Sequence, residues 1–349
     1  MPFQRPLIAP TANPLLEQAL RQKLQRRSET TGSLGELEPL AVQLGLMQNS
    51  LKPAFESPQI VVFAADHGLA VEGIGAVEGR STGELVQLLL SQRLPLAVFA
   101  RTNGLNLCVV DSGLAEPGAP HPRLLARKIA HGTRNARSGS AMSQDQAQAA
   151  VRAGMEIAAA LPGNAVACAG IGVGSHESAA LVLSRLAGAE LAGLVSKETA
   201  AQEPAPGHLF MVLQAAQARH KDVIDPLHVM AAFGGFEMAM MVGLMLGAAS
   251  RRHLLLLDGM PACAALMVAS RIAPAVSDYC IHCRSHSHRG LDAALSLFGA
   301  TALLELGIES TDGTGATLAW PLVRSAAALL TEVADGDDPG PTRPGLLTP

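Results

Sequence analysis

An acidic residue stands directly before a small glycine loop near the end of the chain, in the segment STDGTGA at residues 310–316. Glycines allow the backbone to approach a ligand closely, and the free N–H groups at a helix start can hold an anion. Asp312 would then be placed to accept a proton from a molecule that the loop anchors. The same residue could instead be a helix N-cap, so the segment alone leaves both roles open.

A second glycine-rich turn, GIGVGS at residues 170–175, follows an apolar run and precedes a segment with helical spacing. This context suits a phosphate held at a helix N-terminus by Gly170, Gly172, Gly174 and Ser175. The spacing is GxGxG, which is not the dinucleotide fingerprint, and no acidic residue ends a second strand at the expected distance. The alternative is a tight strand-to-helix turn without a ligand.

Two further acidic residues occupy the predicted end of a strand and the predicted start of a helix. Asp66, in DHG at residues 66–68, could hold a hydroxyl or a proton, or could cap the next turn. Glu237, in GGFE at residues 234–237, could contact a ligand, or could stabilise its helix through a first-turn charge. Both alternatives remain open for each residue.

The segment CIHCRSHSH at residues 280–288 concentrates thiols and imidazoles that zinc accepts as ligands. No second, distant ligand pair is evident, so we weigh a metal site against a polar loop in which Arg284 and Ser285 hold an anion. We favour the anion-binding loop and predict no metal site.

Strands that alternate with helices must position these residues. Short apolar runs that end in polar or glycine residues predict strands at 60–65, 105–110, 165–169 and 254–257, and helical spacing covers 84–100, 143–161, 236–249 and 262–272. This alternation predicts an α/β fold with an open, mostly parallel sheet covered by helices on both faces. Because ligands bind outside the carboxyl ends of such strands, Asp66, Asp111, Gly170 and Asp258 are expected along one edge.

Composition narrows the class of protein. The chain has 349 residues, 48% of them hydrophobic, with a net charge of -4 and five cysteines. We see no basic stripe with interleaved aromatics, which argues against a nucleic-acid partner. An odd number of cysteines, mostly in apolar runs, indicates free thiols in a reducing compartment. The first residues lack the apolar core of a signal peptide, and no stretch is long and apolar enough for a bilayer, so we expect a cytoplasmic protein without a membrane partner.

We predict a Rossmann-like domain over residues 58–282. Residues 1–57 and 283–334 are predicted to form a small helical domain from the two ends of the chain, with a helix near 316–333. Residues 335–349 are rich in Gly, Pro and Asp, which is typical of a loose tail.

Taken together, these segments resemble the nicotinate-nucleotide:dimethylbenzimidazole phosphoribosyltransferase family. The matching stretches are GSLGELE at 32–38, VFAADHG at 62–68, GTRN at 132–135, GIG at 170–172, GGFE at 234–237, LLDG at 256–259 and DGTGA at 312–316. Each stretch alone is weak, but the ordered set is specific and covers residues 15–334.

The resemblance implies a homodimer that transfers the phosphoribosyl group of nicotinate mononucleotide to a benzimidazole-type base for the cobalamin nucleotide loop. The pyridinium ring becomes a neutral pyridine ring when nicotinate leaves, so the resemblance implies a reaction that needs no metal or redox cofactor. The attacking imidazole loses its N–H proton as the new bond forms, and a carboxylate base would accept it.

The sequence departs from the family pattern at the residues that would touch ligands. Asp312 stands where the family has a glutamate, which shortens the side chain by one methylene, and Cys168 stands where the family has another acid. The family's lysine near the donor phosphate falls at Leu209. The acceptor loop carries Gly75 and Val77 where the family has Ser and Tyr-Pro-Gln.

By resemblance, Asp312 is the predicted catalytic base. The predicted donor-binding residues are Gly170, Gly172, Gly174, Ser175, Glu237, Arg284, Ser285, Gly313, Thr314 and Gly315, and the predicted acceptor pocket comprises Asp66, Gly75, Val77 and Glu84. The alternatives are a catalytically impaired paralogue that binds or regulates an active relative, and a metalloprotein that uses residues 280–288.

Overall fold

The computed structural model describes residues 3–74, 80–116, 118–195, 207–285 and 290–334. Its six-stranded sheet has the order β3-β2-β1-β4-β5-β6, and every paired strand is parallel. The strands are β1 (Gln59–Ala65), β2 (Asn106–Gly113), β3 (Leu124–Ala126), β4 (Ala165–Ile171), β5 (Leu254–Leu257) and β6 (Cys280–His282). The predicted parallel α/β sheet is confirmed, and the short edge strands β3 and β6 complete it.

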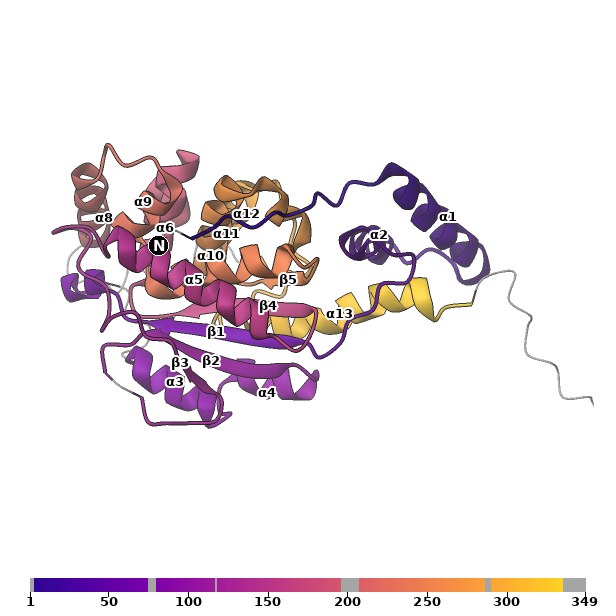
Figure 1. The fold of residues 1–349 in the computed structure, drawn as a ribbon, viewed down its shortest axis with the longest axis horizontal. Helices are drawn as coiled ribbons and strands as arrows, with labels where there is room; N and C mark the ends of the chain where they lie inside the picture. The colour runs from indigo at the N-terminus through magenta and orange to yellow at the C-terminus, as the bar shows by residue number, and fades with distance from the viewer. Residues whose placement is uncertain (1–2, 75–79, 117, 196–206, 286–289, 335–349) are drawn as a thin grey trace, which may run out of the picture. The chain divides into compact units, whose positions relative to one another are not determined.

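The helices alternate with the strands along the chain (Figure 1). They are α3 (Thr82–Leu90), α4 (Pro95–Thr102), α5 (Gln144–Ala160), α6 (Ser175–Ala187), α7 (Leu191–Leu194), α8 (His208–Arg219), α9 (Pro226–Phe233), α10 (Phe236–Ala249), α11 (Met260–Ile272), α12 (Leu291–Ser296) and α13 (Thr314–Thr331), with 3₁₀ turns η1 (Gly68–Glu72) and η3 (Pro274–Tyr279). No helix among these described residues has the length and apolar character needed to cross a membrane.

Helices cover both faces of the sheet, as predicted. Successive residues of a strand point to opposite faces. Gly170 of β4 faces α10 and α11, where a side chain would collide with Met241 and Pro261, whereas its neighbour Ala169 lies beside Gly313, just before α13. The sheet is therefore buried on both sides, which explains why its strands are continuous apolar runs.

The chain crosses from one side of β1 to the other between β3 and β4. β1 pairs with β2 on one side and with β4 on the other, and Ala64 is in register with both Asp111 and Ile171. The carboxyl ends of β1 and β4 therefore lie side by side at a topological switch point, where open α/β sheets bind ligands. The turns that begin at Asp66 and Gly172 leave the sheet from this point.

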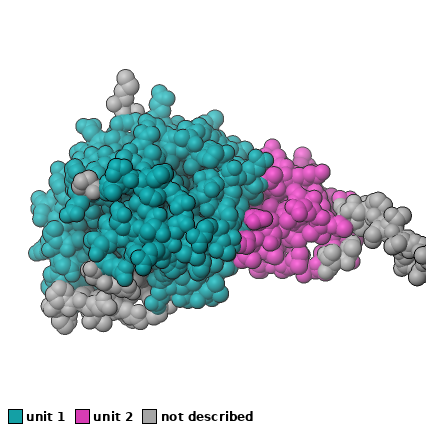
Figure 2. Space-filling model, turned by 90° about the horizontal axis from the view of Figure 1, so that it is seen from below, with its two compact units in different colours: residues 1–10, 55–320 teal, residues 11–54, 321–349 magenta. Residues whose placement is uncertain are grey.

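The chain divides into two compact units, coloured separately in Figure 2. Unit 1 comprises residues 1–10 and 55–320 and contains the sheet. Unit 2 comprises residues 11–54 and 321–349; it contains α1 (Pro14–Thr31), α2 (Leu37–Gln48) and the second part of α13. The domain boundaries inferred from the sequence remain predictions, and the predicted tail at 335–349 lies outside the described residues.

The backbones of α5 and α10 lie in close contact, so a larger residue between them should destabilise the protein. A Cβ at Gly243 of α10 would collide with the carbonyl oxygen of Val151 in α5. Gly243→Ala must push these helices apart, so we expect a loss of about 1–3 kcal/mol in unfolding free energy. In the control Gly83→Ala, the new Cβ meets only the Ser81 hydroxyl at 4.0 Å, and we expect no loss. Urea denaturation measures both variants, and equal midpoints would contradict the prediction.

Candidate functional site

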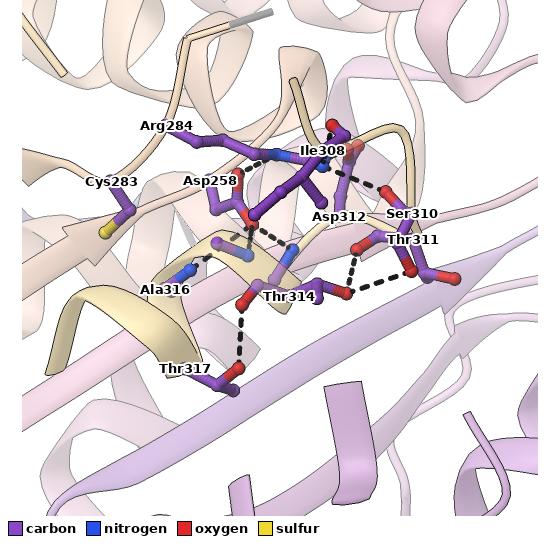
Figure 3. A network of polar contacts seen from close by, with 12 residues as sticks. Asp258, Cys283, Arg284, Ile308, Ser310, Thr311, Asp312, Thr314, Ala316 and Thr317 are labelled. Atoms are coloured by element: carbon purple, nitrogen blue, oxygen red, sulfur yellow. Dashed lines mark hydrogen bonds and ion pairs between the residues drawn. The ribbon is translucent and has the colours of Figure 1, made fainter. Parts of the chain in front are cut away.

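Asp258, the first residue after β5, organises the region around Asp312. Its Oδ1 accepts a hydrogen bond from Nε of Arg284 at 2.6 Å, and its Oδ2 accepts the backbone N–H groups of Gly313 and Gly315, both at 2.7 Å (Figure 3). A helix N-terminus attracts negative charge, and here an internal carboxylate supplies it. The two glycine amides that the sequence predicted for a phosphate are therefore engaged by Asp258.

Arg284 links the two carboxylates. Its Nη2 donates to Oδ1 of Asp312 at 2.8 Å, while its Nη1 donates to the carbonyl oxygens of Ile308 and Ser310. Burial lowers the pKa of Arg284, but the charges of Asp258 and Asp312 outweigh this and raise it, so the guanidinium stays protonated. Arg284 thus holds groups of the protein and fixes the loop that carries Asp312, and its predicted role in binding an anion stays a prediction.

His176, in the first turn of α6, contacts the other oxygen of Asp312. Its Nε2 lies 2.8 Å from Oδ2 of Asp312. The histidine side chain is 27% exposed, whereas the aspartate side chain is 5% exposed. The carboxylate is thus more deeply buried than the imidazole that contacts it. Sequence analysis missed His176, although its position directly after the turn at 170–175 was a usable signal.

A cleft of about 450 Å³ brings the two glycine-rich turns together in unit 1. One side consists of Gly170 and Ile171 at the end of β4 and of Gly172 directly after it, and the other is the loop 309–312. His176 also lines the cleft. An apolar wall and two cations complete it: Leu85, Leu88, Leu94, Pro95, Arg80 and Arg93. The cleft therefore combines a carboxylate–imidazole pair, positive charge and a surface suited to a flat ring.

A buried polar network lies beneath the turn at 170–175. Oε1 of Glu237 accepts from the Ser175 hydroxyl at 2.9 Å and lies 2.8 Å from Nε2 of His67. Nδ1 of His67 lies 2.9 Å from the Ser178 hydroxyl. Burial lowers the pKa of His67, but the charge and hydrogen bond of Glu237 outweigh it, with smaller contributions from other carboxylates, and the pKa is raised. Ser175 and Glu237 therefore hold the turn from inside.

This network predicts a pH-dependent contribution to stability. Because the pKa of His67 in the folded protein lies above its ordinary value of 6.5, the stabilisation is fully present below about pH 6.5 and is lost as the pH rises through the raised value. The difference in unfolding free energy between the wild type and His67→Gln should therefore shrink with rising pH. Urea denaturation across this range measures it, and the variant His228→Gln, at an exposed histidine, is the control. A difference that does not change with pH would contradict the prediction.

Several predicted residues have local structural roles. Oδ2 of Asp66 accepts the N–H of Ala115 at 2.7 Å, which stabilises a turn. Glu84 forms a capping box with Ser81 at the start of α3, and these hydrogen bonds lower the pKa of Glu84. Gly174, with φ 84°, is the left-handed residue before α6. Gly75 and Val77 lie outside the described residues.

Two polar residues near Arg284 and Asp312 also bond within the protein. The Thr314 hydroxyl donates to the carbonyl oxygen of Thr311 at 2.6 Å, and the Ser285 N–H donates to Leu304. Their predicted donor-binding roles remain predictions.

The thiols of Cys280 and Cys283 and the imidazole of His282 are buried. Burial raises the pKa of Cys280 and Cys283 well above the ordinary thiol value and lowers the pKa of His282 to about 4. In the part of the chain that the structure describes, no group of three His, Cys, Asp or Glu side chains is arranged to hold a metal. His286 and His288 lie outside that part.

These features define a doubly wound α/β protein with a ligand cleft at the carboxyl ends of its central strands. The sequence model of a family described as Phosphoribosyltransferase matches residues 9–340. The chain belongs to the nicotinate-nucleotide–dimethylbenzimidazole phosphoribosyltransferase family, as the resemblance implied.

Similar proteins span almost the whole chain. The protein named nicotinate-nucleotide–dimethylbenzimidazole phosphoribosyltransferase from Cupriavidus necator is 41% identical, over 91% of this chain and 94% of its own. The protein of that name from Variovorax paradoxus is 37% identical over 97% of both chains. A crystal structure under that name from Thermus thermophilus superposes with a TM-score of 0.85 and 30% identity, covering 93% of this chain and 97% of that chain. None of these matches supports an impaired regulatory paralogue.

Proposed function

We propose that this protein transfers the phosphoribosyl group of nicotinate mononucleotide to a benzimidazole-type base and releases nicotinate. The observation that carries the proposal is the cleft in which the turn after β4 faces the loop of Asp312. Family membership supports the same reaction. The product would serve the nucleotide loop of cobalamin.

The geometry supports a division of roles within the cleft. The apolar wall formed by Leu85, Leu88, Leu94 and Pro95 suits a flat aromatic acceptor. Gly170, Ile171 and Gly172 line the cleft together with the loop 309–312, so the sugar would lie between these two segments. Asp312 provides the negative charge that favours removal of a proton from the acceptor. Holding donor and acceptor together converts the transfer into an in-line displacement within one complex.

The reaction gives a direct test of this proposal. Purified protein is incubated with nicotinate mononucleotide and 5,6-dimethylbenzimidazole, and both nicotinate and the benzimidazole nucleotide are quantified by chromatography. We expect equal amounts of the two products, with no nicotinate formed when the acceptor is omitted. Absence of both products, with this base and with other benzimidazoles, would overturn the proposal.

Arg80 and Arg93 are proposed to bind the donor phosphate, since the amides of Gly313 and Gly315 are engaged by Asp258. A hydrogen bond to a charged group contributes about 1.5–3 kcal/mol, so losing both arginines should raise the KM for nicotinate mononucleotide by roughly tenfold or more. Steady-state kinetics of the double variant Arg80→Ala/Arg93→Ala measure this. The exposed Arg219→Ala serves as control, and an unchanged KM in the double variant would contradict the role.

We also propose that the protein is a cytoplasmic homodimer. The resemblance to the family supports the dimer, and the five free cysteines of the structure are compatible with a reducing compartment. Light scattering coupled to gel filtration tests the dimer, for which the mass should be twice that of one chain.

A further inference from the structure

The contacts of Asp312 limit its ability to act directly on a substrate. Oδ1 lies 2.8 Å from Nη2 of Arg284, and Oδ2 lies 2.8 Å from Nε2 of His176. Both carboxylate oxygens therefore already have hydrogen-bond partners within the protein. The side chain is also only 5% exposed. Asp312 is thus covered and restrained by its neighbours.

His176 contacts this carboxylate and lines the same cleft. A carboxylate that accepts from one ring nitrogen fixes the tautomer, so Nε2 carries the proton and Nδ1 keeps its lone pair. Among the described residues, no group hydrogen-bonds to Nδ1 of His176. The imidazole lines the cleft together with Asp312 and the turn after β4. It therefore presents a basic nitrogen beyond the reach of the short Asp312 side chain.

We propose that Nδ1 of His176 is the immediate proton acceptor in the transfer reaction, and that Asp312 is a positioning residue that acts through it. This inference rests on the proposed function and names a residue for it. The acceptor nitrogen forms a bond to carbon 1 of the ribose, and the bond from that carbon to the pyridinium nitrogen breaks with its electron pair. Nicotinate leaves, the N–H proton of the acceptor passes to Nδ1, and the imidazolium later releases it to water.

The charges around His176 favour this arrangement. Asp312 and Glu309 come from the loop before α13, and these carboxylates stabilise an imidazolium as it forms. Arg284 lies on the far side of Asp312, and Arg80 and Arg93 line the same cleft. Only the neutral imidazole can accept a proton from the bound acceptor.

The variant His176→Gln distinguishes a role of His176 as a base from a purely structural role. The glutamine amide can still donate to Asp312, but it has no basic nitrogen. We expect kcat to fall by about 10²- to 10⁴-fold, with a much smaller change in KM and a pH profile that differs from that of the wild type. Free imidazole should restore part of the activity of His176→Ala. The control His228→Gln should behave as the wild type, and thermal unfolding verifies that each variant is folded.

The direct-base alternative predicts the opposite results. If Asp312 takes the proton itself, His176→Gln keeps kcat within about tenfold of the wild type with the same pH profile, and Asp312→Glu increases kcat. Those results would overturn the inference while leaving the proposed function intact. If His176 accepts the proton, as we propose, Asp312→Glu lowers kcat because the longer side chain displaces the imidazole. Failure of the wild type to release nicotinate would overturn the proposed function, and this inference with it.

Discussion

Replacement of Asp258 by alanine is expected to lower the unfolding free energy by about 3–5 kcal/mol. The carboxylate is 2% exposed and holds Nε of Arg284 together with the backbone N–H groups of Gly313 and Gly315. Its removal leaves a buried guanidinium with one fewer counter-charge and leaves the first amides of α13 without their acceptor. Arg284 is then no longer held in place by Asp258, and the loop 308–312, which Arg284 holds, becomes less well anchored.

Urea denaturation provides the measurement for Asp258→Ala. The exposed Asp222→Ala is a matched control, and we expect it to change stability by less than about 0.5 kcal/mol. We also expect Asp258→Ala to lose transferase activity, because Asp312 and His176 depend on Arg284 for their positions. Stability within about 1 kcal/mol of the wild type would show that Asp258 is not a structural centre.

Asp312→Asn is expected to decrease nicotinate release by about 10²- to 10⁴-fold. The amide has nearly the same shape but no charge to stabilise an imidazolium, and its NH₂ group favours the wrong tautomer of His176. The expected loss is in kcat rather than in KM, because Asp312 acts on the transition state. Steady-state kinetics with both substrates varied would measure it, with Asp222→Asn as the control. A variant with full kcat would exclude any catalytic role for this carboxylate.

The sheet was predictable because its signals are local. The four predicted strands are apolar runs that end in a polar or glycine residue, and a strand buried on both faces has that pattern. The edge strands β3 and β6 are only three residues long, which is too short to give a recognisable period. Alternation of strands and helices then determined the parallel arrangement.

The site was only partly predictable because its contacts join distant residues. The turn at 170–175 and the loop of Asp312 were each visible as glycine-rich segments, and the structure places them in one cleft. No local pattern indicated that Asp258 would reach the amides at the start of α13, or that Arg284 would bridge two carboxylates. Such pairings depend on tertiary distance, and a lone histidine after a turn shows no partner until the fold supplies one.

The bridge made by Arg284 has an evolutionary consequence. Loss of the arginine alone would leave two buried negative charges side by side, and loss of either aspartate alone would leave a buried guanidinium N–H group without its acceptor. Single-step substitutions at any of the three positions are therefore disfavoured, even where activity is not under selection. Descendants of this chain should change positions 258, 284 and 312 together or retain all three.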